Sequence, residues 1–289
     1  MGGVSLAAIS ANRKAPLYML AASVCWSFGG LCIKFIPWTA PSIVGLRACF
    51  AAAVFAIYRR NLRVSLSPGN LLSALCLAAT TNLFVYANKM TTAAAAILLQ
   101  FTAPVFIILI ELVMYRKKPR LGELAAVSLT ILGMLLFFAD RLEAGNMLGN
   151  LLAIASGFTF AGVFLCNNRA DVDTEQSLFL GFVINALIGL PFVFTGVSGD
   201  TVAWIAVVFL GIVQVGLAYI LFSIGIKETP ALLACLIGAA EPILNPLWVA
   251  LFTAEVPGPF AFAGGLVILI TVVAYNLWLE KHPSIPDPN

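Results

Sequence analysis

Ten long apolar stretches constrain the fold of this chain more than any other feature. A bilayer-spanning helix needs about 20 mainly apolar residues, and each stretch contains 17 to 24. The stretches lack the alternating pattern of a membrane barrel, so only helices satisfy all their backbone polar groups in lipid. The sequence therefore predicts an all-α polytopic membrane protein with ten transmembrane helices. The stretches are 17–36, 42–58, 70–88, 92–115, 121–139, 148–167, 177–195, 203–226, 231–253 and 259–279.

The composition excludes several classes of protein. Of 289 residues, 61% are apolar and 10% are charged, against roughly 25% charged in a soluble domain. Ten spans leave too few residues for a separate soluble domain, and a net charge of +3 gives no reason to expect a nucleic-acid partner. The six cysteines lie inside apolar stretches without CxxC spacing, and the only histidine, His282, lies in the polar tail. We therefore expect no metal site and no cofactor.

The distribution of Lys and Arg predicts the orientation. Arg13 and Lys14 precede the first stretch, as in a signal peptide, but nine further stretches follow it, so we interpret it as the first helix. With the N-terminus inside, the inner loops collect twelve basic residues and the outer loops three, which are Lys34, Lys89 and Arg141. The positive-inside rule then predicts a multi-pass protein of the bacterial inner membrane with both termini in the cytoplasm.

The two halves of the chain resemble each other. A shift of 138 residues places Lys89 on Lys227 and Pro104 on Pro242, and a shift of 132 places residues 21–30 on 153–162. Five helices per copy is an odd number, so the second copy is expected to be inverted, as in many secondary transporters. We expect one repeat at 1–145, a second at 146–280 and a disordered tail at 281–289. The alternative is chance similarity among apolar stretches.

An ordered set of motifs resembles the EamA-type carriers of the drug/metabolite transporter superfamily. The second half carries Glu241-Pro242, a long apolar stretch, Glu255 and then a helix with Gly264-Gly265, and the first half carries Gly45-Leu46-Arg47 and Tyr86-Ala-Asn-Lys89. The resemblance implies two inverted five-helix bundles around a central cavity and the movement of small organic metabolites, often outward. One departure is that Ala103 and Lys117 replace the two acids in the first half.

Glu241 is the most informative residue. It lies near the middle of the stretch 231–253, where a charge costs about 2.5 to 3.5 kcal/mol on insertion scales. Helical spacing places Asn245 and Trp248 on the same stripe. Glu241 is either a cavity-lining acid that contacts a cationic group or takes up a proton, or a buried structural acid.

Pro104 and Pro242 are candidate hinges. Proline within a helix removes a backbone donor and kinks the helix, which frees carbonyls near the middle of the membrane. These carbonyls could bind a substrate ammonium group, and the alternative is a kink without any ligand contact.

Polar and aromatic side chains at membrane depth complete the candidate substrate site. They suit a polar or zwitterionic metabolite, but each could equally bond a neighbouring helix or pack in the core. Gln214 and Tyr219 are five residues apart, so we expect at most one of the two to point squarely inward. Arg47, Lys34 and Glu111 lie near helix ends and are expected to be structural, with Arg47 reaching outward to the interface. The remaining candidates are Trp26, Ser27, Asn82, Tyr86, Gln100, Thr159, Gln214 and Tyr219.

Together these features predict a secondary carrier, an exporter of amino acids or related amines that works by alternating access in the lipid bilayer, with protons as candidate coupling ions. The alternatives are another substrate of the superfamily, such as an organic cation, drug or nucleobase, or a non-transporting scaffold or receptor. An intramembrane enzyme is disfavoured because only one acid is central and no histidine lies in a span. The chain also has no Walker loop.

Overall fold

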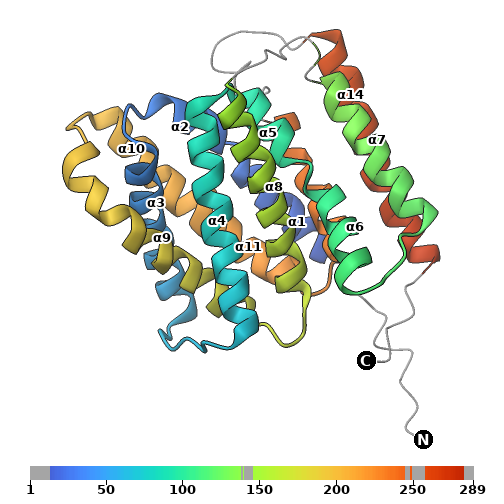
Figure 1. Cartoon of the computed structure of the whole chain (residues 1–289), viewed down its shortest axis with the longest axis horizontal. Helices are drawn as coiled ribbons and strands as arrows, with labels where there is room; N and C mark the ends of the chain where they lie inside the picture. Colours follow the sequence, from blue (N-terminus) through green and yellow to red (C-terminus); the bar gives the residue numbers. More distant parts are fainter. Residues whose placement is uncertain (1–13, 138, 140–145, 245–247, 249–257, 283–289) are drawn as a thin grey trace, which may run out of the picture.

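The computed structural model describes residues 14–137, 139, 146–244, 248 and 258–282, and within these ranges it contains helices and turns but no strand. Eight helices are long and apolar enough to cross a membrane, and the shorter apolar helices Leu121–Phe137 and Ala231–Leu244 accompany them. The helices stand side by side as one bundle (Figure 1). The chain is therefore an all-helical polytopic membrane protein, as its sequence predicts.

The helices begin where the sequence supplies a proline or a polar cap. Proline occupies the first turn of α1, α3, α4, α6 and α14, where no backbone donor is needed. The side chains of Ser67, Thr92, Asn146, Asp173 and Asp200 accept hydrogen bonds from the first turns of α4, α5, α8, α9 and α10. The elements are α1 (Ala15–Trp26), α2 (Gly29–Phe35), α3 (Ala40–Arg59), α4 (Pro68–Met90), α5 (Ala93–Gln100), α6 (Ala103–Met114), α7 (Leu121–Phe137), α8 (Met147–Asn168), α9 (Thr174–Gly196), α10 (Thr201–Phe209), η3 (Leu210–Leu217), α11 (Ala218–Gly225), α12 (Ala231–Gly238) and α14 (Pro259–Lys281).

Four of the predicted spans are not continuous α-helices. Residues 27–28 separate α1 from α2, residues 101–102 separate α5 from α6, and residue 239 separates α12 from the helical residues 240–244. In the span that contains α10 and α11, the π-helix η3 lies between the two α-helices. Irregular backbone at membrane depth is tolerated only where protein or a polar cavity surrounds it. The four interruptions therefore mark the part of the bundle where a polar site can lie.

Helices from the two halves of the chain pack against each other. α3 lies on α9, α4 on α8, α7 on α14 and α1 on α11. α3 and α9 approach so closely that a Cβ added to Gly45 would lie 2.6 Å from the backbone carbonyl carbon of Gly189. Small residues allow this approach, which is typical of helix contacts in membranes. The two halves thus form a single interlocked bundle.

Candidate functional site

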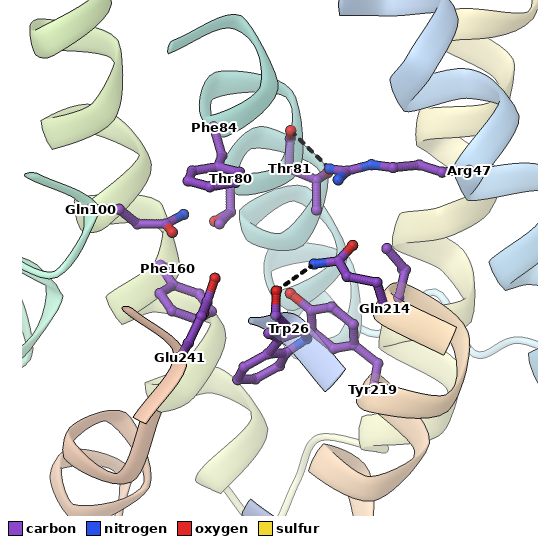
Figure 2. A pocket seen from close by; sticks show the side chains of 11 residues that line it. Trp26, Arg47, Thr80, Thr81, Phe84, Gln100, Phe160, Gln214, Tyr219 and Glu241 are labelled. Carbon is purple, nitrogen blue, oxygen red and sulfur yellow. Dashed lines mark hydrogen bonds between the residues drawn. The ribbon is translucent and has the colours of Figure 1, made fainter. Parts of the chain in front are cut away.

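A small cavity of about 40 Å³ lies where the interrupted helices meet. This volume holds only a few water molecules. Every lining residue is buried, with exposed fractions of 3% to 8%, and the side chains converge from several helices (Figure 2). The lining residues are Trp26, Arg47, Thr80, Thr81, Phe84, Gln100, Phe160, Gln214, Val215, Tyr219 and Glu241.

Glu241 enters the cavity from the first turn of the helical segment that follows the break at Ala239. Its side chain is 6% exposed. Among the described residues, none hydrogen-bonds to its carboxyl group or forms an ion pair with it. A buried carboxylate without a partner is costly, and proteins normally pair or solvate such a group.

Arg47 contradicts its prediction as an outward-reaching structural residue. It is the eighth residue of α3, is 3% exposed and lines the cavity. Its Nη2 atom donates a hydrogen bond to the carbonyl oxygen of Thr81 at 3.2 Å. The prediction was wrong because the long side chain reaches sideways to α4 and the polar cavity rather than along its own helix to the interface. The depth of Arg47, two turns inside a span, was the signal in the sequence.

Arg47 and Glu241 extend into the cavity from opposite sides (Figure 2). No ion pair joins them, since their nitrogen and oxygen atoms are more than 4 Å apart in the described structure. The described residues also contain no cluster of three His, Cys, Asp or Glu side chains that could hold a metal ion. The arrangement is therefore suited to binding a small polar molecule between an arginine and an acid.

Neutral polar groups lie between these charges. The Nε2 atom of Gln100 donates to Ser156 Oγ at 2.7 Å, and that of Gln214 makes a long contact of 3.5 Å with the carbonyl oxygen of Trp26. Gln214 Oε1 and Trp26 Nε1 are buried and have no hydrogen-bond partner among the described atoms. Buried polar groups are rarely left unpaired. One acceptor and one donor beside the cavity are thus unpaired in the described structure.

Gln214 and Tyr219 both line the cavity, so the prediction that at most one would point squarely inward is wrong. The reason is η3, the π-helix that contains Gln214 and ends just before Tyr219. Hydrogen bonds in a π-helix join residues five apart, so side chains at this spacing share a face. Standard helical periodicity could not reveal this geometry, although π-helical segments are common at functional sites.

Aromatic rings form much of the cavity wall. The Trp26 ring lies 5.2 Å from that of Tyr219 and 5.9 Å from that of Phe160, centroid to centroid. Sequence reasoning did not select Phe160, Phe84, Thr80 or Thr81 for the site. Phe160 is the repeat counterpart of Phe28, and the two threonines precede Asn82 in the sequence, so a broader search around the chosen residues would have found them.

Other sequence candidates lie away from the cavity. Ser27 accepts a hydrogen bond from Trp248 Nε1 at 2.7 Å, and the Trp248 ring stacks on Phe28. Asn82 donates to Asn185 Oδ1 at 2.6 Å and so joins α4 to α9.

Tyr86 is 38% exposed on the outside of the bundle. Thr159 accepts a hydrogen bond from Thr80 Oγ1 at 2.8 Å, behind the cavity wall. Asn245 lies outside the described residues.

Pro104 and Pro242 occupy corresponding places beside the cavity. Pro104 is the second residue of α6, and Pro242 lies in the first turn of residues 240–244. Each proline therefore begins a new helical segment instead of kinking a continuous helix, because proline is compatible with the first turn. Gln100 is the last residue before the first break, and Glu241 lies in the helical segment that follows the second break.

Comparisons with known proteins point to one family. The sequence profile of the EamA-like transporter family matches residues 13–139 and again residues 147–277. The uncharacterized transporter YwfM of Bacillus subtilis is 26% identical over 225 residues, which cover 74% of each chain. An uncharacterized transporter of Archaeoglobus fulgidus is 25% identical over 192 residues, which cover 66% of this chain and 69% of its own. A solved crystal structure shares the fold, with a TM-score of 0.77 at 22% identity, and the match covers 94% of this chain and 99% of that one.

Proposed function

Because the chain belongs to the EamA-like transporter family, of the drug/metabolite transporter superfamily, we propose that it is a secondary carrier that exports small polar metabolites such as amino acids or related amines. The observation that carries this proposal is Glu241, a buried acid without a described partner that faces a central cavity. A ligand whose cationic group pairs with Glu241 would account for an acid at this buried position.

The proposed mechanism is alternating access between two inverted five-helix bundles, the first within residues 1–145 and the second within 146–280. The packing of the helices supports this arrangement. An inverted repeat that relates α1 to α8 and α4 to α11 converts the contact of α4 with α8 into the contact of α11 with α1, and both contacts are present. In the same scheme α3 with α9 and α7 with α14 are self-related pairs, and both are also in contact.

The contacts of two lysines also fit an inverted repeat. Lys89 Nζ donates to the carbonyl oxygen of Ile36, just after α2. Its repeat counterpart Lys227 donates at 3.1 Å to the carbonyl oxygen of Arg169, just after α8. Each lysine therefore binds the end of the first helix of its own repeat, and inversion would place these contacts at opposite membrane faces. With ten crossings, the distribution of Lys and Arg supports a cytoplasmic location for both termini.

The cavity must widen during transport, because its volume of about 40 Å³ is too small for most metabolites. We propose that the breaks before Pro104 and Pro242 are the hinges. Backbone that is already free of regular helical hydrogen bonds changes its dihedral angles at low cost. Protons are the proposed coupling ions, with Glu241 as the group that exchanges them.

Counterflow in proteoliposomes tests the proposal. Radiolabelled amino acids and the corresponding decarboxylated amines are supplied as a panel to wild-type protein and to Glu241→Gln. We expect uptake of at least one compound by the wild type and a decrease of about 10- to 100-fold in the variant, because a hydrogen bond to a charged group contributes about 1.5–3 kcal/mol. The variant is expected to elute as a folded protein in size-exclusion chromatography.

Glu280→Gln is the matched control, because Glu280 is exposed near the end of α14. It should transport like the wild type. Wild-type transport by Glu241→Gln would remove Glu241 from the mechanism. Absence of flux above that of empty liposomes for every compound in the panel would contradict the proposed function.

A further inference from the structure

Arg47 lines the cavity, and transport of simple amines gives no reason for an arginine at this position. Its guanidinium group has five N–H donors, but the described structure gives it a single hydrogen bond, to the neutral carbonyl oxygen of Thr81. No carboxylate of a described residue pairs with it. A fixed cation repels an ammonium compound that enters the same small cavity. Arg47 therefore narrows the chemistry of the substrate.

The two charges compensate each other only in part. Transfer of an ion from water to the protein interior costs several kcal/mol, and a close, well-oriented partner is needed to repay that cost. Arg47 and Glu241 face one cavity but do not touch. A single molecule with a negative group and a positive group could bridge them and complete both at once.

The groups between Arg47 and Glu241 are arranged for such a molecule. Tyr219 lines the cavity together with both charged side chains, and its ring packs against that of Trp26. Two further lining residues each carry a buried polar atom without a described partner, the acceptor Gln214 Oε1 and the donor Trp26 Nε1. Polar side chains therefore accompany both charges around the cavity, as the binding of a dipolar ligand requires.

We infer that the substrate is a small zwitterion whose carboxylate binds Arg47 and whose ammonium group binds Glu241. This inference rests on the proposed function and makes Arg47 a specificity-determining residue. Arg binds carboxylates in a planar, two-point geometry that a lysine cannot reproduce. The rings of Trp26 and Phe160 are left to contact the remainder of the substrate.

A site of this kind should bind zwitterions more tightly than molecules that carry only one of the two charges. Three sets of compounds provide the test: L-leucine, L-phenylalanine and L-serine, each with its decarboxylated amine and its deaminated acid. Binding is measured by dose-dependent thermal stabilisation of the purified protein, because a ligand that binds the folded state raises the unfolding temperature. Passive diffusion of the amines and acids through a bilayer does not affect this assay.

For wild-type protein we expect at least one amino acid to bind about 10- to 100-fold more tightly than both its amine and its acid, since each lacks one charge-assisted hydrogen-bonding partner. Arg47→Gln should weaken binding of that amino acid by a similar factor while leaving its amine unchanged or bound more tightly. Glu241→Gln should weaken binding of the amino acid and of its amine, and should leave binding of the deaminated acid unchanged. Arg47→Lys, which keeps the charge but loses the planar geometry, should be intermediate.

Arg63→Gln is the control, because Arg63 is an exposed arginine beyond the end of α3. It should bind like the wild type. Equal affinity for amino acid and amine, unchanged in Arg47→Gln, would overturn the zwitterion assignment and leave the carrier function standing. Failure of all nine compounds to stabilise wild-type protein would also overturn the assignment. The counterflow panel then decides separately whether the protein transports another compound.

Discussion

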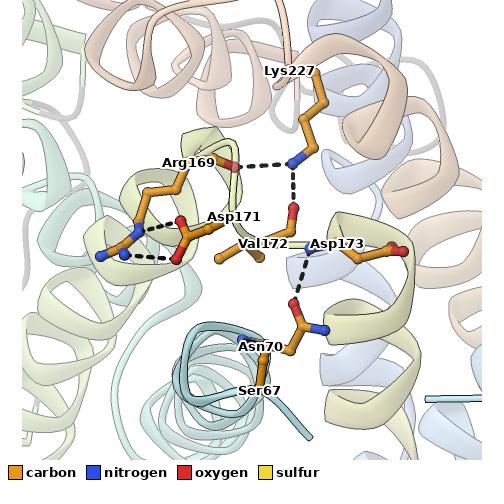
Figure 3. Close-up of polar contacts among 7 residues, drawn as sticks. All are labelled: Ser67, Asn70, Arg169, Asp171, Val172, Asp173 and Lys227. Atoms are coloured by element: carbon orange, nitrogen blue, oxygen red, sulfur yellow. Dashed lines mark hydrogen bonds and ion pairs between the residues drawn. The ribbon is translucent and has the colours of Figure 1, made fainter. Parts of the chain in front are cut away.

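The central cavity and the loop that joins α8 to α9 both hold opposite charges, but they arrange them differently. In the loop, Arg169 donates two hydrogen bonds of 2.8 Å to Asp171 (Figure 3). The two side chains are 46% and 59% exposed. Lys227 donates to the backbone carbonyl oxygens of Arg169 and Val172. The loop thus pairs charges that water could also solvate.

The cavity has the reverse arrangement, because Arg47 and Glu241 are buried but remain apart. Surface ion pairs contribute little to stability, whereas buried charges without close partners reduce it. The loop arrangement is explained by folding alone. The cavity arrangement is not, and a functional site is the usual place where a protein keeps a costly arrangement.

Removal of both cavity charges should change the stability of the protein more than any substitution in the loop. The double variant Arg47→Gln, Glu241→Gln should have a higher free energy of unfolding than the wild type, because it removes two buried charges that lack a close partner. The upper limit is about 4 kcal/mol, the largest gain seen when apolar residues replace a buried ion pair. It should also lose transport. Unfolding in detergent, followed by intrinsic fluorescence, measures the change.

Each single variant leaves one buried charge without its counter-charge in the cavity, so both should be less stable than the double variant. A double variant less stable than the wild type and than either single variant would mean that the two charges hold the bundle together. The comparison between cavity and loop would then fail.

The smallest expected effect concerns the loop. The hydrogen bonds from Arg169 hold the pKa of Asp171 below its ordinary value. Because the pKa of the folded state is lower than that of the unfolded state, the pair stabilises the fold above the unfolded value of about 3.9, and this contribution is lost as the pH falls through the folded value.

Asp171→Asn removes that contribution. At pH 7 we expect at most a slight decrease in unfolding temperature and no change in transport. The slight difference in unfolding temperature should disappear as the pH falls through the folded-state pKa of Asp171. A pH series of thermal unfolding curves measures the difference in stability, and counterflow at pH 7 measures transport. A large loss of transport in Asp171→Asn at pH 7 would show that the loop, and not only the cavity, takes part in function.

Much of the fold follows from the sequence. Long apolar stretches permit only helices in a bilayer, and prolines and polar caps mark where the helices begin. Glu241 could also be identified from the sequence, because a central acid in an apolar span needs an explanation wherever its side chain points. The predictions for Trp26 and Gln100 rest on the same kind of reasoning, and both residues line the cavity.

The remaining parts of the site depend on contacts that one sequence does not encode locally. The inward position of Arg47 depends on α4, which supplies the carbonyl oxygen of Thr81. The shared face of Gln214 and Tyr219 depends on a π-helix. Asn82 was predicted to line the site, but its amide donates a hydrogen bond to Asn185 of α9, which lies 103 residues away in the sequence. Helical periodicity describes one helix at a time, whereas these positions are set by neighbouring helices.

A structure of the protein with bound amino acid would show whether one substrate molecule bridges the two cavity charges. The probe is whichever of L-leucine, L-phenylalanine and L-serine stabilises the wild type most strongly, at saturating concentration. We expect its carboxylate about 2.7–2.9 Å from the guanidinium nitrogens of Arg47 and its ammonium group beside Glu241. A ligand bound elsewhere, or a direct ion pair between Arg47 and Glu241 that excludes the ligand, would contradict the account.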